Sequence, residues 1–287
     1  MSKKGLKTPL RYPGGKSRAC TKMGQFFPDL REYVEFREPF LGGGSVAIHV
    51  SKMYPHLKIT VNDLYEPLIN FWMNLQMFGD ELTKELKNLK ITNCNQDSAR
   101  CLFAEMKDVI NDSKYTNLER AVAFYIVNKC SFSGLTESSS FSAQASDSNF
   151  SMRGIEKLPE YSEIISHWHI NQYSYEYCFR ENIHAGLFMY LDPPYDIKDN
   201  LYGKSGAMHK SFDHDKFAAD CDEHNNINML ISYNSDQLVK DRFKNWSASE
   251  FKLTYTMRSV GEYMRDQQER KELLLFNYKL SEVTVDG

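Results

Sequence analysis

The sequence predicts an α/β protein with a doubly wound sheet that is interrupted by an insertion of helices and loops. Residues 33–50 pass from a short apolar segment through a glycine-rich turn into a helical pattern, and residues 58–72 read as strand, Asn-Asp and helix. Such an alternation is typical of βαβ units in a parallel sheet. A second strand pattern returns only at 185–195, so the intervening residues form the insertion.

The composition is that of an ordinary globular protein. The chain has 287 residues, 41% of them hydrophobic and 25% charged, which is enough for one large domain with an insertion. No apolar run approaches the roughly 18 residues that span a bilayer, and no apolar segment follows the basic N-terminus as in a secretory signal. The six cysteines form no C-x-x-C pair. We therefore expect a cytoplasmic protein without a membrane segment or a metal site.

The first segment, RYPGGKS at 11–17, resembles a phosphate loop. The strict pattern requires a glycine at the position of Leu10, and Tyr12 occupies a place where a triphosphate needs bare backbone. A nucleoside triphosphatase is therefore disfavoured. Residues 1–22 carry seven lysines and arginines and no acidic residue, which indicates either a phosphate-contacting patch or a solvated tail.

The second segment is the glycine turn at 42–44. Ser45 is placed to cap the helix that follows. Asp63 comes 19 residues after Gly44, close to the separation of roughly 20 between a glycine loop and a ribose-binding carboxylate. Because Ala47 and Ile48 stand where a dinucleotide fingerprint has its third glycine, a dehydrogenase is disfavoured. A nucleoside-type pocket with Asp63 on the ribose hydroxyls remains.

The insertion begins with three amphipathic helical patterns from about 75 to 125 and continues with a Ser-rich segment at 131–151. We expect the latter to be a long polar loop with a function. A helix and a strand follow at about 215–234, and 272–280 supplies another strand.

The main chemical signal is Asp192-Pro193-Pro194-Tyr195, at the end of the strand pattern 185–195. Ligands of open α/β sheets bind beyond the carboxyl ends of the strands, and two prolines make such a loop rigid. A carboxylate, a backbone carbonyl and an aromatic face suit an exocyclic amine on a planar ring. The alternative is a turn that ends the strand and buries its tyrosine.

Several motifs in order resemble the Dam-type (D12 class) DNA adenine-N6 methyltransferases. They are LRYPGGK at 10–16, REPFLGGGS at 37–45, VND at 61–63, NKCSFSGL at 128–135, LDPPY at 191–195, ISYN at 231–234 and KELLLFNY at 271–278. Their order is similar to that of the α group. The resemblance implies the Rossmann-like sheet of class I S-adenosylmethionine-dependent methyltransferases, with a catalytic domain at 1–74 and 176–287 and a target-recognition insertion at 75–175.

The implied activity is direct methyl transfer from S-adenosylmethionine to N6 of an adenine flipped out of duplex DNA. The resemblance places catalysis on Asp192, Pro193, Pro194 and Tyr195. It assigns cofactor binding to the following residues: Tyr12, Gly14, Gly15, Lys16, Pro39, Phe40, Gly42, Gly44, Ser45, Asp63, Phe179 and Asp192. Arg258 matches a late motif near the active site. Candidate DNA contacts are Lys16, Arg18, Asn128, Lys129 and Arg153.

The sequence departs from the family at two places. Cys178-Phe179 stands where the family has an Asp-Phe pair about a dozen residues before the Pro-Pro motif, so Phe179 keeps the stacking position and the hydrogen-bonding partner is missing. The loop after Gly134 differs from the hairpin of the GATC-specific members, so this recognition sequence does not carry over.

Two alternatives stay open. The same chemistry applies to amino groups of RNA or of protein glutamine, and a DNA-binding module that has lost catalysis would keep the fold. His167-Trp168-His169 and Asp213-His214-Asp215 do not have metal-ligand spacing. We expect a monomer in a bacterial or phage-infected cell.

Overall fold

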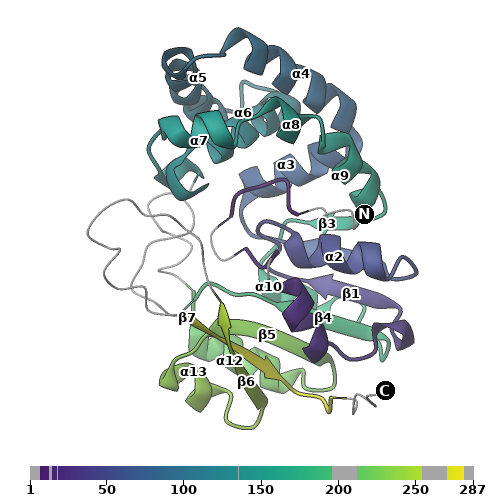
Figure 1. Cartoon of the computed structure of the whole chain (residues 1–287). Helices are drawn as coiled ribbons and strands as arrows, with labels where there is room; N and C mark the ends of the chain where they lie inside the picture. Colours follow the sequence, from purple (N-terminus) through teal and green to yellow (C-terminus); the bar gives the residue numbers. More distant parts are fainter. Residues whose placement is uncertain are drawn as a thin grey trace, which may run out of the picture.

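The structure is a computed structural model that describes residues 7–12, 15–17, 19–134, 136–195, 212–253 and 270–280. Within these residues seven strands form one sheet in the order β3-β2-β1-β4-β5-β7-β6 (Figure 1). The strands are β1 (Glu35–Glu38), β2 (Lys58–Asn62), β3 (His169–Asn171), β4 (Leu187–Leu191), β5 (Asn228–Asn234), β6 (Ser247–Leu253) and β7 (Arg270–Phe276).

The sheet confirms the predicted doubly wound α/β fold and adds one feature. Strands β3, β2, β1, β4 and β5 pair in parallel. Strand β7 lies between β5 and β6 and is antiparallel to both. The amino end of β7 therefore lies at the same edge of the sheet as the carboxyl ends of the parallel strands. This edge carries the site described below.

Both faces of the sheet are covered, as a mainly parallel sheet requires. In β4 every residue is buried, and alternate side chains enter different cores. Phe188 and Tyr190 belong to the core under the N-terminal helices and the insertion, whereas Leu187, Met189 and Leu191 belong to the core on the other face. This explains why the strand reads as a continuous apolar run in the sequence.

The helices divide between these two cores. The first core receives α1 (Cys20–Met23), α2 (Ser45–Met53) and α3 (Glu66–Met77), and the second receives α10 (Tyr175–Arg180), α12 (His214–Glu223) and α13 (Gln237–Arg242). Short 3-10 turns occupy Gly24–Phe26 and Leu30–Glu32. None of the helices in the described part of the chain is both long and apolar enough to cross a membrane.

The insertion is a helical lobe that packs on α2 and α3, at the β3 edge of the sheet (Figure 1). Its helices are α4 (Gly79–Thr92), α5 (Gln96–Val109), α6 (Asn117–Cys130), α7 (Ala143–Ser148), α8 (Met152–Ile155) and α9 (Leu158–Ile165). Helix α6 begins with a capping box between Thr116 and Glu119 and is buried from Ala121 to Cys130. It therefore forms the centre of the lobe.

Two local predictions were wrong. The Ser-rich segment 131–151 is not an irregular loop, because it contains 3-10 turns at Phe132–Gly134 and Thr136–Ser138 and the helix α7. Ser142 and Ser151 cap the helices α7 and α8 through their side chains, so the serines that indicated a loop are helix starts. The cap of α2 is Gly44 in the left-handed conformation, not Ser45.

Candidate active site

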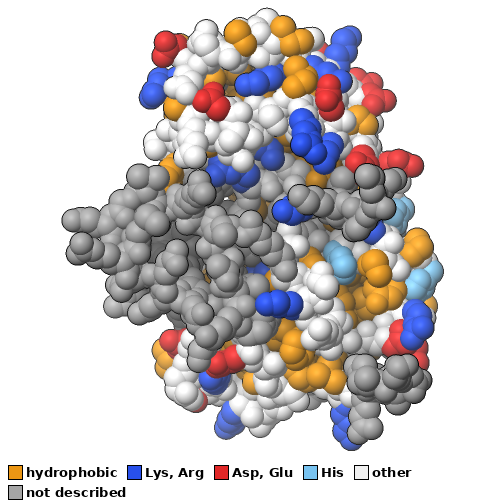
Figure 2. Space-filling view, in the orientation of Figure 1, with side chains coloured by type: hydrophobic (Ala, Val, Ile, Leu, Met, Phe, Trp, Pro, Cys, Tyr) orange, Lys and Arg blue, Asp and Glu red, His pale blue; other side chains and the backbone are white. Residues whose placement is uncertain are grey.

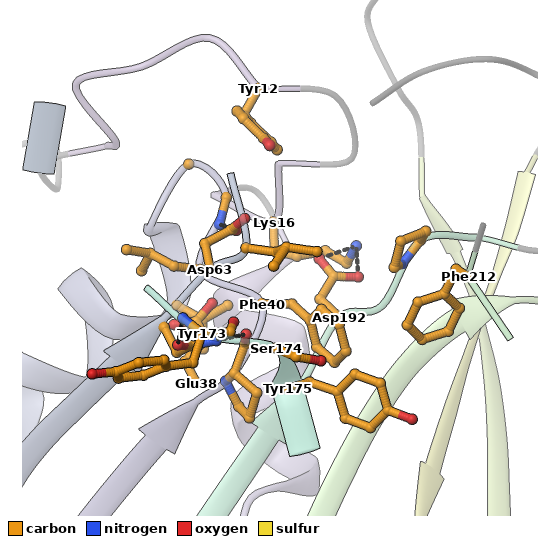
Figure 3. Close-up of a pocket in the computed structure, with 18 of the residues that line it drawn as sticks. Tyr12, Lys16, Glu38, Phe40, Asp63, Tyr173, Ser174, Tyr175, Asp192 and Phe212 are labelled. Carbon is orange, nitrogen blue, oxygen red and sulfur yellow. Dashed lines mark hydrogen bonds and ion pairs between the residues drawn. The ribbon is translucent and has the colours of Figure 1, made fainter. Parts of the chain in front are cut away.

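A cavity of about 320 Å³ opens at the carboxyl ends of β1, β2 and β4 (Figure 3). Its size lies at the lower end of the range of about 300–1,000 Å³ for small-molecule sites. The lining comes from six segments of the chain: Tyr12 with Gly15 and Lys16, the stretch between Glu38 and Val46, Asn62 to Leu64, Tyr173 to Glu176, Asp192 with Pro194, and Phe212 with Asp213 and Lys216.

The glycine turn forms one wall of the cavity. Gly42 and Gly44 both have positive φ, at 48° and 66°, a conformation that costs other residues energy. The Asp63 carboxylate accepts hydrogen bonds from the N–H groups of Gly42, at 2.9 Å, and Tyr65, at 3.0 Å. The ring of Tyr12 lies against Gly42 and Gly43 so closely that a Cβ on Gly42 would be 2.9 Å from it.

Five carboxyl groups line the cavity: Glu38, Asp63, Glu176, Asp192 and Asp213. Burial, with the charges of Asp192 and Asp63, holds the pKa of Glu38 well above its usual range, although the Ala47 N–H group is bonded to it. Burial raises the pKa of Asp63 to about 7. Burial also raises the pKa of Asp192, against the opposing charge of Lys16. The lining is therefore suited to a ligand that carries positive charge or hydrogen-bond donors.

Lys16 is buried, with 2% of its surface exposed, and its ammonium lies beside Asp192. The Lys16 Nζ is 3.0 Å from both carboxylate oxygens of Asp192 and 2.6 Å from the hydroxyl of Tyr195. It also forms an ion pair of 3.1 Å with Glu272, which lies near the start of β7. The backbone N–H of Lys16 donates to Ser45 Oγ at 3.2 Å.

The loop after β4 is held from two sides. Ser232 on β5 donates a hydrogen bond of 3.0 Å to Asp192 and is itself 2.9 Å from the hydroxyl of Tyr190. The Tyr195 hydroxyl donates to Glu272, and its ring stacks on Tyr233 at 6.1 Å. Asp192 and Tyr195 therefore have defined orientations before any ligand binds.

An aromatic wall faces the glycine turn. Phe40 stacks on Tyr175 with a centroid distance of 5.5 Å and meets Phe212 edge-on at 5.8 Å (Figure 3). Phe179 does not line the cavity: it is 2% exposed and packs between Tyr175 and His224. Cys178 and Phe179, to which the resemblance assigned the family's Asp-Phe position, are therefore not among the residues that line the cavity.

Ser174 and Tyr175, which follow β3 and begin α10, face the cavity in place of Cys178 and Phe179. The register was ambiguous in the sequence, because residues four apart lie on the same side of a helix and both pairs end in an aromatic residue.

Nine residues that the resemblance assigned to the cofactor line the same cavity: Tyr12, Gly15, Lys16, Pro39, Phe40, Gly42, Ser45, Asp63 and Asp192. Gly44 supports the turn from behind, since a Cβ there would be 2.8 Å from the buried Trp72. Gly14, Arg18 and Arg258 lie outside the described residues.

Three of the residues expected to contact DNA are buried: Lys16, Asn128 and Lys129. Asn128 is fully buried. Its side-chain oxygen accepts a hydrogen bond of 2.9 Å from the Arg11 N–H, and its side-chain nitrogen donates one of 2.6 Å to the Arg11 carbonyl. Lys129 is 9% exposed with its Nζ 5.2 Å from the ring centre of Tyr125, and burial lowers its pKa to about 7. Lys16 points into the cavity as described above. Arg153 on α8 is exposed and keeps its assignment as a prediction.

Four site residues escaped the sequence-based prediction. Glu38 ends β1 and lies within the motif REPFLGGGS, directly before Pro39 and Phe40, which were assigned to the cofactor. Ser232 lies on β5 within the motif ISYN and Glu272 on β7 within the motif KELLLFNY, but neither was given a role in the site. Tyr175 was missed because the stacking position was assigned to Phe179.

The histidine patterns do not form a metal site in the described part of the structure, where no group of three or more metal-ligating side chains occurs. Trp168, between the two histidines of the first pattern, donates to Ser51 at 2.8 Å and belongs to the core. In the second pattern, His214 is hydrogen-bonded to the hydroxyl of Tyr233.

The comparisons with known proteins agree with this geometry. The model of the D12 class N6 adenine-specific DNA methyltransferase family matches residues 12–257. The type II methyltransferase M.MjaIII of Methanocaldococcus jannaschii is 24% identical over 201 residues, which cover 66% of this chain and 69% of that protein. A DNA N-6-adenine-methyltransferase of Escherichia phage P1 is 27% identical over 126 residues, 44% of this chain and 15% of the phage protein.

Among solved structures, the rRNA methyltransferase aviRa of Streptomyces viridochromogenes aligns with 93% of this chain and 86% of its own. Its TM-score of 0.36 and 9% identity are too low to support any conclusion. The family model, by contrast, covers most of the chain, including the glycine turn and Asp192. This chain therefore belongs to the D12 class N6 adenine-specific DNA methyltransferases, enzymes that transfer a methyl group from S-adenosylmethionine to adenine in DNA.

Proposed function

We propose that this enzyme methylates N6 of one adenine within a specific sequence of duplex DNA, and that the cavity holds both S-adenosylmethionine and the flipped base. The observation that carries the proposal is the position of Asp192. It follows the central strand β4, faces the cavity and lies between the glycine turn and the rigid Pro193-Pro194-Tyr195 segment.

The lining fits S-adenosylmethionine by its chemistry. This cofactor, when bound, supplies a methyl group on a positively charged sulfur, and it also carries an ammonium and a ribose diol. Glu38, Asp63 and Asp192 offer carboxyl groups whose pKa values are raised, first of all because they are buried. A cationic ligand stabilises their ionised forms.

Individual residues take separate parts of the cofactor in this proposal. Asp63 accepts hydrogen bonds from the ribose hydroxyls, and the glycine turn allows the ligand to approach the backbone closely. Tyr12 covers the turn, and Phe40 and Tyr175 provide flat apolar surface for a purine ring. Ser174 lines the cavity beside them.

Asp192 prepares the amine that accepts the methyl group. The lone pair of adenine N6 is delocalised into the ring, which makes the amine a poor nucleophile. When Asp192 and the carbonyl of Pro193 accept its two N–H groups, the nitrogen becomes more pyramidal and its lone pair points outward. Ser232 already orients the carboxylate, so Asp192 itself needs little reorientation to accept the amine.

The target base must leave the duplex to reach this cavity. Tyr195 offers an aromatic face on which the base stacks. In Figure 2, lysine and arginine side chains gather near the junction of the helical lobe and the sheet. This distribution supports DNA binding along the junction, with the helical lobe from Gly79 to Ile165 as the target-recognition part and Arg153 as one contact. The end of the predicted range 75–175 belongs elsewhere, because β3 is part of the sheet and Tyr173 to Tyr175 line the cavity.

The relatives named above support a place in a restriction-modification system, and the cytoplasm of a bacterial or phage-infected cell is the matching location. We propose that the enzyme acts as a monomer on DNA.

The test is mass spectrometry of nucleosides from unmethylated duplex DNA after incubation with the protein and S-adenosylmethionine. We expect N6-methyladenine with the native protein and a loss of about 10²–10³-fold or more with Asp192→Asn, because the amine loses its ionised acceptor. Asp236→Asn is the matched control: Asp236 caps α13 away from the cavity, and asparagine caps helices equally well.

Parallel reactions with RNA and with protein substrates separate the alternatives. Methylation of RNA or of protein glutamine, with none of DNA, would refute the DNA proposal and retain the chemistry. Calorimetry with S-adenosylmethionine alone covers the remaining case, because a DNA-binding module without catalysis would bind DNA but not the cofactor.

A further inference from the structure

Glu272 is a buried carboxylate at the edge of the sheet that carries the site. It is 2% exposed and pairs in the ladder with Asn234, the last residue of β5. The next residues of β7, Leu273 to Leu275, belong to the core. Because β7 is antiparallel to β5, its early residues reach the edge where β4 ends and Asp192 begins. The sheet topology therefore brings Glu272 to the site from the far end of the chain.

Two residues of the proposed site are partners of Glu272. A buried carboxylate is costly unless it is paired and hydrogen-bonded. Glu272 forms an ion pair of 3.1 Å with the Lys16 ammonium and accepts a hydrogen bond from the Tyr195 hydroxyl. It does not itself line the cavity, whereas Lys16 does. Glu272 therefore acts on the site through these two side chains.

The Lys16 ammonium occupies the position on Asp192 that a substrate amine requires. It contacts Asp192, the Tyr195 hydroxyl and Glu272 over distances of 2.6 to 3.1 Å. Adenine N6 must donate to the same carboxylate before it can react. The ammonium therefore has to yield Asp192 to the target amine when the base enters.

We propose that Glu272 is a positioning residue for methyl transfer, which retains the Lys16 ammonium as it leaves Asp192 and holds the Tyr195 ring in place for the incoming base. The inference rests on the proposed function of the cavity. Lys16 lies between two carboxylates at nearly equal distances, 3.0 Å to Asp192 and 3.1 Å to Glu272. A small shift toward Glu272 frees Asp192 while the ammonium remains paired, so its charge is not left isolated in a buried place.

Removing the charge of Glu272 would shift the Lys16 ammonium toward Asp192. Lys16 would bind Asp192 more firmly and would compete with the target amine for that carboxylate. The Tyr195 hydroxyl would keep only a weaker, neutral acceptor at this position, so its ring would be held less firmly. Both effects act on the step after DNA binding.

The experiment compares Glu272→Gln with Glu35→Gln in steady-state methylation of duplex DNA, with thermal unfolding measured for each. Glu272→Gln keeps the shape and an oxygen acceptor but removes the charge. Glu35 is the matched control: it is also 2% exposed on a strand and ion-paired, with Arg37 and Lys58, but at the amino end of β1. It is thus a buried strand glutamate away from the cavity.

We expect Glu272→Gln to lower kcat about 10–100-fold, the usual effect of losing a residue that orients a site, with the Kd for S-adenosylmethionine unchanged. Glu35→Gln lowers the melting temperature and leaves kcat unchanged. Adding Lys16→Met to Glu272→Gln removes the competing ammonium. We therefore expect Lys16→Met to reduce activity less in the Glu272→Gln background than in the native protein.

Three results would overturn the proposal. They are native kcat in Glu272→Gln, a loss of activity in both glutamate variants in proportion to their melting temperatures, and an undiminished effect of Lys16→Met in the Glu272→Gln background. If the native protein itself forms no N6-methyladenine in DNA, the proposed function fails first. That outcome is separate from any outcome of the Glu272 series.

Discussion

The glycine turn allows a quantitative test, because Gly42 and Gly44 share a left-handed backbone but face different neighbours. An alanine in this conformation costs about 1–2 kcal/mol. At position 42 the added methyl group would meet the ring of Tyr12 at 2.9 Å, and Tyr12 is only partly buried and can move. We therefore expect Gly42→Ala to lower the free energy of unfolding by about 1–2 kcal/mol, and also to weaken cofactor binding because Tyr12 covers the cavity.

At position 44 the methyl group would be 2.8 Å from Trp72, which is fully buried and cannot retreat. Overpacking of a core typically costs a further 1–3 kcal/mol or so, which gives about 2–5 kcal/mol for Gly44→Ala. In proteins of this size 1 kcal/mol corresponds to roughly 2–4 °C in melting temperature. The two variants should therefore differ clearly in thermal unfolding.

Gly24→Ala is the control, since Gly24 has φ of −56° and a Cβ there would have no atom within 4 Å. Alanine at such a site stabilises a protein by about 0.4–1 kcal/mol through the unfolded state. Thermal unfolding and calorimetry with S-adenosylmethionine measure both quantities. If Gly44→Ala were as stable as Gly42→Ala, or if Gly24→Ala were destabilised like them, the conformational argument would be refuted.

Two further predictions concern the pH dependence of the site and the role of Asn128. Burial raises the pKa of Asp63 from 3.8 to about 7. The fold without ligand is therefore more stable when Asp63 is protonated, and this stability is lost as the pH rises toward and through 7. The ionised form is the one that binds the cofactor, so affinity for S-adenosylmethionine should rise about tenfold between roughly pH 6 and 8; a constant Kd by calorimetry would contradict this. Asn128→Ala leaves the Arg11 backbone unpaired and should cost about 1–3 kcal/mol for each lost partner, measured by thermal unfolding. The affinity of the folded protein for duplex DNA should stay unchanged, and a lower affinity would instead identify Asn128 as a DNA contact.

The sequence by itself determined the features that depend on residues close together in the chain. The βαβ unit followed from the alternation of apolar and glycine-rich segments, and the strand β4 from an apolar run before Asp192. The motifs at 39–45, 61–63 and 191–195 each carry their chemistry within a few residues. Since the carboxyl ends of parallel strands meet at one edge, the convergence of these motifs could be expected from their positions after predicted strands.

The sequence did not reveal which polar residues are buried. Asn128 and Lys129 are polar residues in a helix that also carries apolar ones, and they were taken for surface contacts. Helix α6 is enclosed by its neighbours in the lobe, so both side chains lie inside. Burial on all sides of a helix is a property of the packing around it, which periodicity does not report.

Only the tertiary structure decided the environment of Asp192. Lys16 and Glu272 are 256 residues apart, and their ion pair depends on the insertion of β7 between β5 and β6 in antiparallel orientation. The choice between Tyr175 and Phe179 depended equally on which turn of α10 faces the cavity. Local patterns specify elements and motifs because their causes are local, whereas the partners of a buried charge are set by strand order, which brings distant segments together.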